Sequence, residues 1–202
     1  MARFDELTHM VSPFAPNVPP FVAATAIRDG ARDYFRSVHA HIEEVSIVIS
    51  AGQDTVIIEP DSNGTEILAI TEVQTNDYSK LKKVQSIGVK IDGVPNSYMG
   101  VSTGTIRVAP VPKVNTTLIV KLALRPTYSA TDIEDELLSS NEDGIRYSAL
   151  ARLKRQPATD WYSPEEVGYY QSLFDQEVGQ KRIAIMNGGL SGNITMKIPD
   201  FM

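Results

Sequence analysis

The segment from Ile145 to Asn187 decides the fold that we predict for this chain. It reads IRYSALARLKRQP (145–157), ATDWY (158–162) and SPEEVGYYQSLFDQEVGQKRIAIMN (163–187). Ser163-Pro164, with a glutamate three residues after the serine, is typical of a helix start closed by a capping box. The Asn-Gly pair at 187–188 is typical of a helix end, because glycine adopts the left-handed conformation easily. We therefore predict a helix between these two signals.

An apolar stripe runs along this predicted helix, with spacings of three, four and seven residues. Its members are Val167, Tyr170, Phe174, Val178 and Ile185. The preceding segment has the same periodicity in Ile145, Ala149 and Leu153, and its small alanines permit close approach of another helix. Gln156-Pro157 ends that first helix. Together the two patterns predict a helical hairpin.

We predict that four residues hold this hairpin together: Trp161, Ser163, Tyr170 and Phe174. Trp161 lies in the connection, where it can cover the open end of the helix pair, and we interpret it as a packing anchor rather than a ligand-stacking residue. Ser163 caps the second helix, and the other two lie on its apolar stripe.

The N-terminal part of the chain is predicted to contain an arm followed by a helix. Residues 1–19 hold three prolines and little periodicity, which indicates an extended N-terminal arm. Pro20 begins a helix that runs to about Ala40, with an apolar face. Gly30 within it costs about 1 kcal/mol relative to alanine, so we infer close packing at that position.

The apolar period changes to two from Ile42 onward, which is strand behaviour. The predicted strands cover residues 42–49, 55–59, 67–74, 86–91, 105–108 and 117–124. Six short strands at this spacing predict an antiparallel β-domain at residues 42–125, inserted between helices.

After the β-domain the chain returns to helical patterns. We expect one long, bent helix from Thr131-Asp132 to Arg155, although Asn141-Glu-Asp-Gly144 is a candidate break. Residues 20–41 and 126–187 then form the helical bundle, and residues 188–202 an extended C-terminal tail. The predicted fold is α+β: a bundle of three main helices with an inserted antiparallel β-domain and extended N- and C-terminal arms.

The composition excludes several classes of function. The chain has 202 residues and a net charge of −6, which argues against a protein that binds nucleic acid by neutralising phosphates. It has no cysteine, which excludes disulfides and thiolate chemistry. No apolar run approaches the roughly 20 residues of a membrane span, and no signal-peptide core is present at the N-terminus.

Sequence motifs for catalysis, a cofactor or a metal are weak. His39 and His41 lie beside two glutamates, but polar residues at a helix end explain them better than a metal site. The carboxylates between residues 134 and 143 are interpreted as a solvated face. The basic cluster of Arg152, Lys154 and Arg155 is interpreted as a solvated helix C-terminus, with a phosphate or partner carboxylate as the alternative. We expect a protein without enzymatic activity, cofactor or metal.

The C-terminal tail is the candidate partner-binding segment. Its apolar residues, partly in strand-like alternation, are Leu190, Ile194, Met196, Ile198 and Phe201. One interpretation is a disordered terminus. The other is a strand added to a neighbouring subunit or partner, with backbone hydrogen bonds supplying affinity.

Several motifs resemble one known family. They are APNVPPFVAATAIRDGARDYFR (15–36), DGVP (92–95), VAPVP (108–112), LALRPT (122–127) and YSALARLKRQPATDWYSPEEVGYYQSLFDQEVGQKRIAIMNGG (147–189). Together they are similar to the head-to-tail adaptor (connector) proteins of tailed bacteriophages. The resemblance covers most of residues 15–189, and the hairpin with Trp161 is its most specific part.

This resemblance implies a structural virion protein in the neck between capsid and tail, present in the host cytoplasm during assembly. It implies a homo-oligomeric ring, typically twelvefold, that contacts the portal protein and a tail or nozzle protein while DNA passes through unread. The β-domain is a departure, since smaller adaptors of this kind are nearly all helical. A tail-completion or tail-tube ring remains an alternative, as does a carbohydrate-binding accessory protein with the β-domain as its working module.

Overall fold

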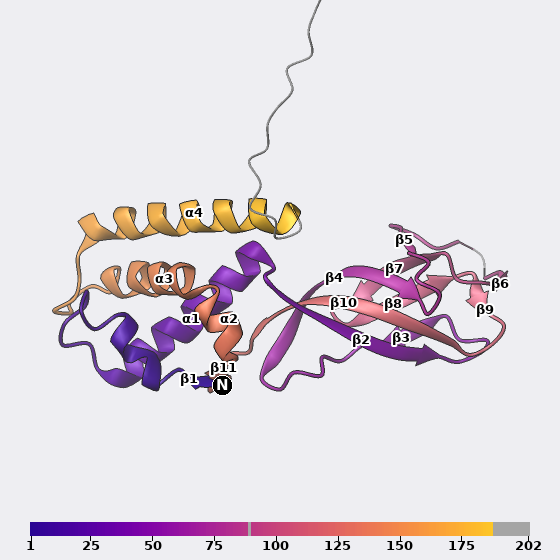
Figure 1. Cartoon of the computed structure of the whole chain (residues 1–202), viewed down its shortest axis with the longest axis horizontal. Coiled ribbons are helices and arrows are strands. Elements are labelled where there is room, and N and C mark those ends of the chain that lie inside the picture. Colours follow the sequence, from indigo (N-terminus) through magenta and orange to yellow (C-terminus); the bar gives the residue numbers. More distant parts are fainter. Residues whose placement is uncertain (89, 188–202) are drawn as a thin grey trace, which may run out of the picture.

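A helical unit and a β unit lie end to end in the computed structural model, which describes residues 1–88 and 90–187 (Figure 1). The fold is mixed α+β, with four α-helices and several sheets in the described part of the chain. The α-helices are α1 (Pro20–Val38), α2 (Asp135–Ser139), α3 (Glu142–Lys154) and α4 (Pro164–Met186). None of them is long and apolar enough to cross a membrane.

The helical unit is built on α1, against which α3 packs, with α4 covering the pair (Figure 1). Pro20 is the first residue of α1, and its buried face includes Ile27, Tyr34 and Phe35. Gly30 does mark a close approach: a Cβ there would lie 2.8 Å from the carbonyl oxygen of Ile145 in α3. Glycine is therefore required at 30 despite its poor helix propensity.

The expected extended N-terminal arm is wrong. Residues 1–19 contain a short strand, β1 (Ala2–Arg3), and a 3₁₀ helix, η1 (Glu6–Met10). β1 pairs with β11 (Asp132–Ile133), and the apolar side chains of this segment enter the helical core. The buried ones are Phe4, Leu7, Met10, Val11 and Ala15. The prolines prevented a long regular helix, but the buried apolar side chains fold the segment onto α1.

The single long helix expected up to Arg155 is also wrong. The chain forms β11 and the short α2, turns at Ser140-Asn141, and starts again as α3. Gly144 lies inside α3 rather than ending a helix, and a Cβ at this position would clash with the Tyr34 ring. The glycine that suggested a break is thus a packing residue.

The hairpin predicted from residues 145–187 is present as α3 and α4, joined by residues 155–163. Tyr170, Phe174 and Val178 are buried along α4. Ile185 is 43% exposed, contrary to its place in the predicted stripe. The reason is that α1 ends at Val38, and Arg182 already reaches Ser37, so the last turn of α4 extends beyond its neighbours.

The β unit contains a central three-stranded antiparallel sheet in the order β2-β10-β4. Its strands are β2 (His41–Ile49), β10 (Thr116–Pro126) and β4 (Thr65–Thr75). Alternate residues of β2 are buried or half-buried and those between them are exposed, as its period of two predicted. β10 lies between the other two strands, and its buried residues Leu118, Val120 and Leu122 form the centre of the β core.

A second sheet has the order β3-β8-β7-β5, and β6 pairs with β9. Its strands are β3 (Thr55–Ile57), β8 (Thr105–Ala109), β7 (Ser97–Ser102) and β5 (Lys82–Lys83); the separate pair is β6 (Asp92–Gly93) and β9 (Val111–Pro112). The strand predicted at 86–91 was wrong, since the described residues of that range form none, and β7 was missed. The pairs β5–β7 and β6–β9 are parallel, so the β unit is not purely antiparallel.

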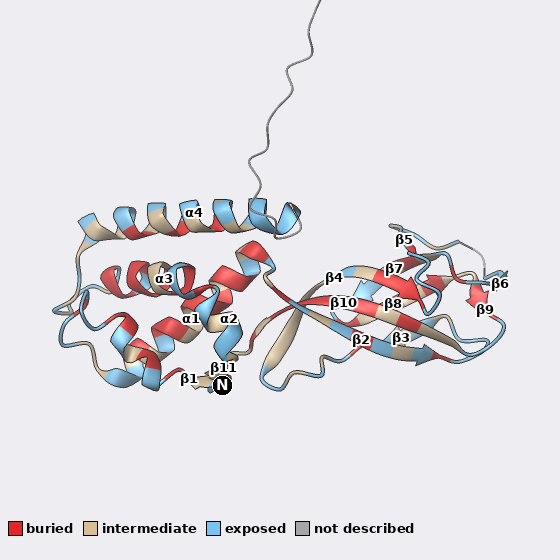
Figure 2. Cartoon of the chain, in the orientation of Figure 1, coloured by how far each residue is buried: buried red, intermediate tan, exposed pale blue. Residues whose placement is uncertain are grey.

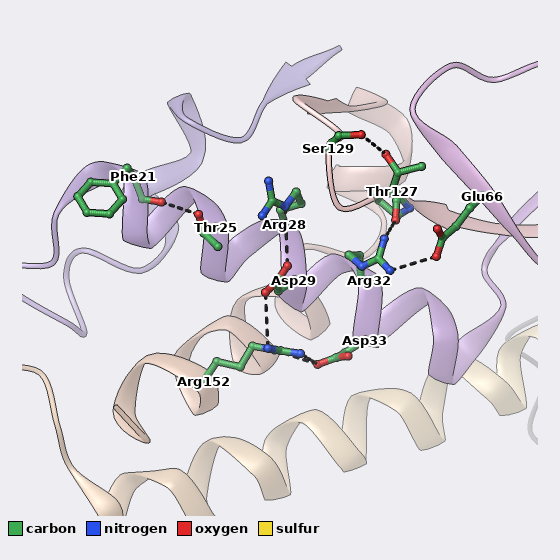
Figure 3. A network of polar contacts seen from close by, with 11 residues as sticks. Phe21, Thr25, Arg28, Asp29, Arg32, Asp33, Glu66, Thr127, Ser129 and Arg152 are labelled. Atoms are coloured by element: carbon green, nitrogen blue, oxygen red, sulfur yellow. Dashed lines mark hydrogen bonds and ion pairs between the residues drawn. The ribbon is translucent and has the colours of Figure 1, made fainter. Parts of the chain in front are cut away.

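The two units have separate apolar cores, and buried residues lie in bands on both sides of the junction (Figure 2). A buried arginine joins them (Figure 3). Arg32 of α1 donates hydrogen bonds to the Pro126 carbonyl at the end of β10 and, at 3.0 Å, to the carboxylate of Glu66 in β4. Its guanidinium also lies 3.5 Å from the centroid of the Tyr128 ring. Burying this charge is tolerable because it is paired and hydrogen-bonded.

Candidate functional site

An open groove of about 810 Å³ lies between α1, α3 and α4. Four arginines line it, one from α1, two from or just after α3, and one from α4: Arg36, Arg152, Arg155 and Arg182. Among the described residues that line it, Asp33 is the only carboxylate. We call this the arginine groove. Its excess of positive charge contrasts with the net charge of −6 of the whole chain.

Two of the four arginines are held in place by partners within the subunit. Arg152 forms an ion pair of 2.6 Å with Asp33 and a longer one of 3.7 Å with Asp29, both on α1 (Figure 3). Arg182 of α4 donates from Nε to the Ser37 carbonyl at 2.7 Å. These contacts tie all three helices together around the groove and fix its shape.

The other two arginines project into solvent. Arg36 and Arg155 are exposed, and neither has an ion-pair partner within the part of the chain that the structure describes. Their guanidinium groups are planar forks of N–H donors, suited to carboxylate or phosphate groups. Chemically, the groove can bind an anionic partner.

The basic cluster at the end of α3 differs from the solvated helix end that the sequence suggested. Lys154 is 5% exposed, and its ammonium lies 2.9 Å from the carboxylate of Glu166 in α4. This contact, opposed by partial burial, holds the pKa of Glu166 below its ordinary value. The cluster is therefore divided: Lys154 locks the hairpin, while Arg152 and Arg155 face the groove.

The capping box expected at Ser163 is absent from the described residues. Pro164 does begin α4, but the Ser163 side chain makes no capping hydrogen bond. Its backbone N–H instead donates to the Lys154 carbonyl at 3.0 Å, and Glu166 pairs with the Lys154 ammonium. Ser163 thus connects the two helices through its backbone.

The other three residues assigned to hairpin packing are buried in the helical core or half-buried against it. Tyr170 and Phe174 are buried, and the Phe174 ring lies edge-on to Tyr34 with 6.3 Å between centroids. Burial raises the pKa of Tyr170. Trp161 is half-buried against the helical core, and its Nε1 donates to the Gln156 side-chain oxygen at 3.1 Å.

The residues predicted to bind partners through the tail lie outside the described residues: Leu190, Ile194, Met196, Ile198 and Phe201. What the structure does place near the end of α4 is a group of exposed apolar side chains. They are Ile183, Ile185 and Met186.

The two histidines of the weak metal motif are placed differently by the fold. His39 is exposed at the end of α1 with a positive φ of 54°, whereas His41 is buried at the start of β2 against Phe35. Within residues 1–88 and 90–187, no group of three or more histidine, aspartate or glutamate side chains is arranged to hold a metal ion.

Comparison with protein families shows to which family the chain belongs. A family model described as "SU10 adaptor protein" matches residues 3–192, which is nearly the whole chain. The chain belongs to the SU10 adaptor protein family. No curated protein matches it. Membership of this bacteriophage adaptor family supports a structural role in the virion, consistent with the resemblance found in the sequence.

The arginine groove was only partly foreseeable. Arg152 and Arg155 stood out as a basic cluster, but Arg36 and Arg182 did not, because each is an ordinary charged residue near the end of its own helix. The sequence carries no local signal that places these two beside the others. Only the packing of α1, α3 and α4 brings the four together.

Proposed function

We propose that this adaptor is a ring-forming structural protein that joins the capsid portal to the tail. In this proposal it assembles with copies of itself, twelvefold, and contacts the portal protein and a tail or nozzle protein in the virion neck. DNA passes through the ring without sequence recognition, and the subunit has no enzymatic activity. The family match over residues 3–192 carries the proposal.

The arrangement of the subunit supports this role. A helical unit and a β unit at opposite ends give one subunit two separate surfaces for different partners (Figure 1). The net charge of −6 suits a channel that does not retain DNA, since like charges repel. The arginine groove and the exposed end of α4 offer contact surfaces of different chemistry on the helical unit.

The direct test is the mass of the purified chain by light scattering, alone and mixed with its portal protein. A dodecamer, or a monomer that gathers into twelve copies on the portal, is expected. A chain that stays monomeric and ignores the portal would overturn the proposal. A sixfold ring without portal affinity would favour the tail-tube alternative.

The contribution of the tail is tested by deleting Leu190–Met202. We expect weaker ring assembly or portal docking, with the circular dichroism spectrum of the folded part unchanged. Assembly equal to that of the full chain would remove the tail from the set of partner-binding segments.

The carbohydrate-binding alternative has little support in the β unit. Tyr78 and Tyr98 are its only aromatic residues, and Tyr98 is 3% exposed in the β core. The buried Tyr98 ring offers no face on which a sugar can stack, and Tyr78, which is 75% exposed, supplies a single ring. A polysaccharide binding screen with a clear signal would reopen this alternative.

A further inference from the structure

Charge is segregated between the two ends of α3. Arg152 and Arg155 of the arginine groove lie at its C-terminal end. At its N-terminal end, five carboxylates project from α2, from the residue before it and from the first turn of α3. We call them the acidic edge: Glu134, Asp135, Glu136, Glu142 and Asp143.

The acidic edge is only partly neutralised within the subunit. Asp135 accepts from the N-terminal amino group at 2.8 Å, and Arg146 contacts both Glu142, at 3.8 Å, and Asp143. Asp135, Glu136, Glu142 and Asp143 are exposed. Exposed pairs of this kind contribute little energy, so these carboxylates remain available to a partner.

Arg155 is far from the first turn of α3 in its own subunit. Glu142 is the first residue of α3, and Arg155 directly follows its last. At 1.5 Å per residue the two ends lie about 20 Å apart on one rigid helix. Arg155 can therefore meet the Glu142 carboxylate only on a different molecule.

We infer that the arginine groove of one subunit receives the acidic edge of a neighbouring copy. The contact is head-to-tail, because two different surfaces meet, and repetition of such a contact closes into a ring when the rotation permits. The inference rests on the proposed ring and assigns its subunit interface.

Two simpler explanations account for less of the arrangement. Acidic residues at a helix start and basic residues at its end complement the helix dipole, but this concerns only charges in the terminal turns of α3. It does not explain why Arg182 of α4 joins the groove, or why Arg36 and Arg155 are left without partners among the described residues. A DNA phosphate would fit the arginines, but the acidic edge on the same helical unit and the net charge of −6 disfavour a polyanion.

The experiment uses two charge-reversal variants of the full chain. In the groove variant, Arg36→Glu and Arg155→Glu make the groove acidic; in the edge variant, Asp135→Lys, Glu136→Lys and Glu142→Lys make the edge basic. The matched control, Lys82→Glu with Lys83→Glu, makes the same charge change as the groove variant on exposed residues of β5. Circular dichroism and thermal unfolding establish that each variant is folded.

Assembly is measured by light scattering and native mass spectrometry, with and without the portal protein. Each of the two variants alone is expected to assemble about a hundredfold more weakly than the wild type, because like charges then face each other. An equimolar mixture is expected to recover rings in which the two variants alternate, since each acidic surface again meets a basic one. The control is expected to assemble like the wild type.

Three results would overturn the interface. The first is a wild-type ring that both folded variants reproduce, which leaves the proposed function standing and removes only the groove assignment. The second is a failure of the mixture to recover assembly. The third is a groove variant that still forms rings but no longer binds a short duplex DNA or the portal. In that case the groove binds that partner and not a neighbouring copy. A wild-type chain that forms no ring under either condition would instead overturn the proposed function itself.

Discussion

The helical unit and the β unit differ in which parts of the chain form their cores. The β unit is one continuous stretch from β2 to β10, and its core includes residues from Val45 to Leu124. The helical core joins residues as distant as Phe4 and Val178. The β unit can therefore form from contacts within one segment, whereas the helical unit closes only when both ends of the chain meet around the insertion.

The two units and their junction therefore depend on different contacts for their stability. The helical unit depends on close helix contacts at two glycines and on ion pairs that fix the hairpin. The junction depends on a buried charge, Arg32, whose partners come from the β unit. The following four experiments test these dependences separately.

Removing the arginine at the junction is expected to have the largest effect. Arg32→Ala breaks a buried ion pair and its hydrogen bonds, which should lower the free energy of unfolding by about 3 kcal/mol. The control is Arg125→Ala, which removes the other partner of Glu66, at 2.6 Å, from a more exposed position and should cost about 1 kcal/mol. Urea unfolding measures both. An equal cost for the two variants would mean that burial of Arg32 does not couple the units.

Adding a methyl group between α1 and α3 is expected to have the next largest effect. Gly144→Ala places a Cβ against the Tyr34 ring and should cost about 2 kcal/mol through overpacking. Gly179→Ala in α4 is the matched control, because no atom lies within 4 Å of the added Cβ. There the better helix propensity should stabilise the protein by about 1 kcal/mol. Thermal unfolding of the pair checks the opposite signs, and equal signs would contradict the tight contact at Gly144.

The two partners of the ion pair across the hairpin should differ in how much stability is lost when each is replaced. Glu166→Gln leaves the buried ammonium of Lys154 without its partner and should cost about 2 kcal/mol. Lys154→Met removes the buried charge and leaves Glu166 half-exposed to water, so its cost should be under about 1 kcal/mol. Denaturant unfolding at neutral pH compares them. A larger cost for the methionine variant would indicate that the pair itself, rather than relief of a buried charge, stabilises the hairpin.

The smallest expected effect is a pH dependence at the junction. Burial lowers the pKa of His41 from its ordinary value of 6.5, although Glu134 and Glu43 oppose the shift. The unfolded chain therefore binds a proton more readily, and the His41 contribution to stability is lost as the pH falls from 6.5 toward the lower pKa of the folded state. His41→Gln should flatten this part of the curve of melting temperature against pH between 7.5 and 5. An unchanged slope would assign the acid sensitivity to other groups.

Local signals in the sequence determined the elements whose ends and periods are set by the backbone. Pro20 and Pro164 begin α1 and α4, and alternation from Val45 to Ile49 predicts β2. Gly30 indicated close packing because a helix interior rarely accepts glycine without a reason. These features depend on residues close together in the chain, so a single sequence contains them.

The surfaces that these elements form depend on the tertiary structure. It folded the proline-rich N-terminus into the helical core, divided α2 from α3, and turned Lys154 inward while Arg155 stayed in solvent. Each outcome depends on contacts between segments far apart in the chain, whose burial or ion-pair energy outweighs the local preference. The arginine groove is the clearest case. Its four charges lie near the ends of three separate helices, and only the packing of those helices brings them together.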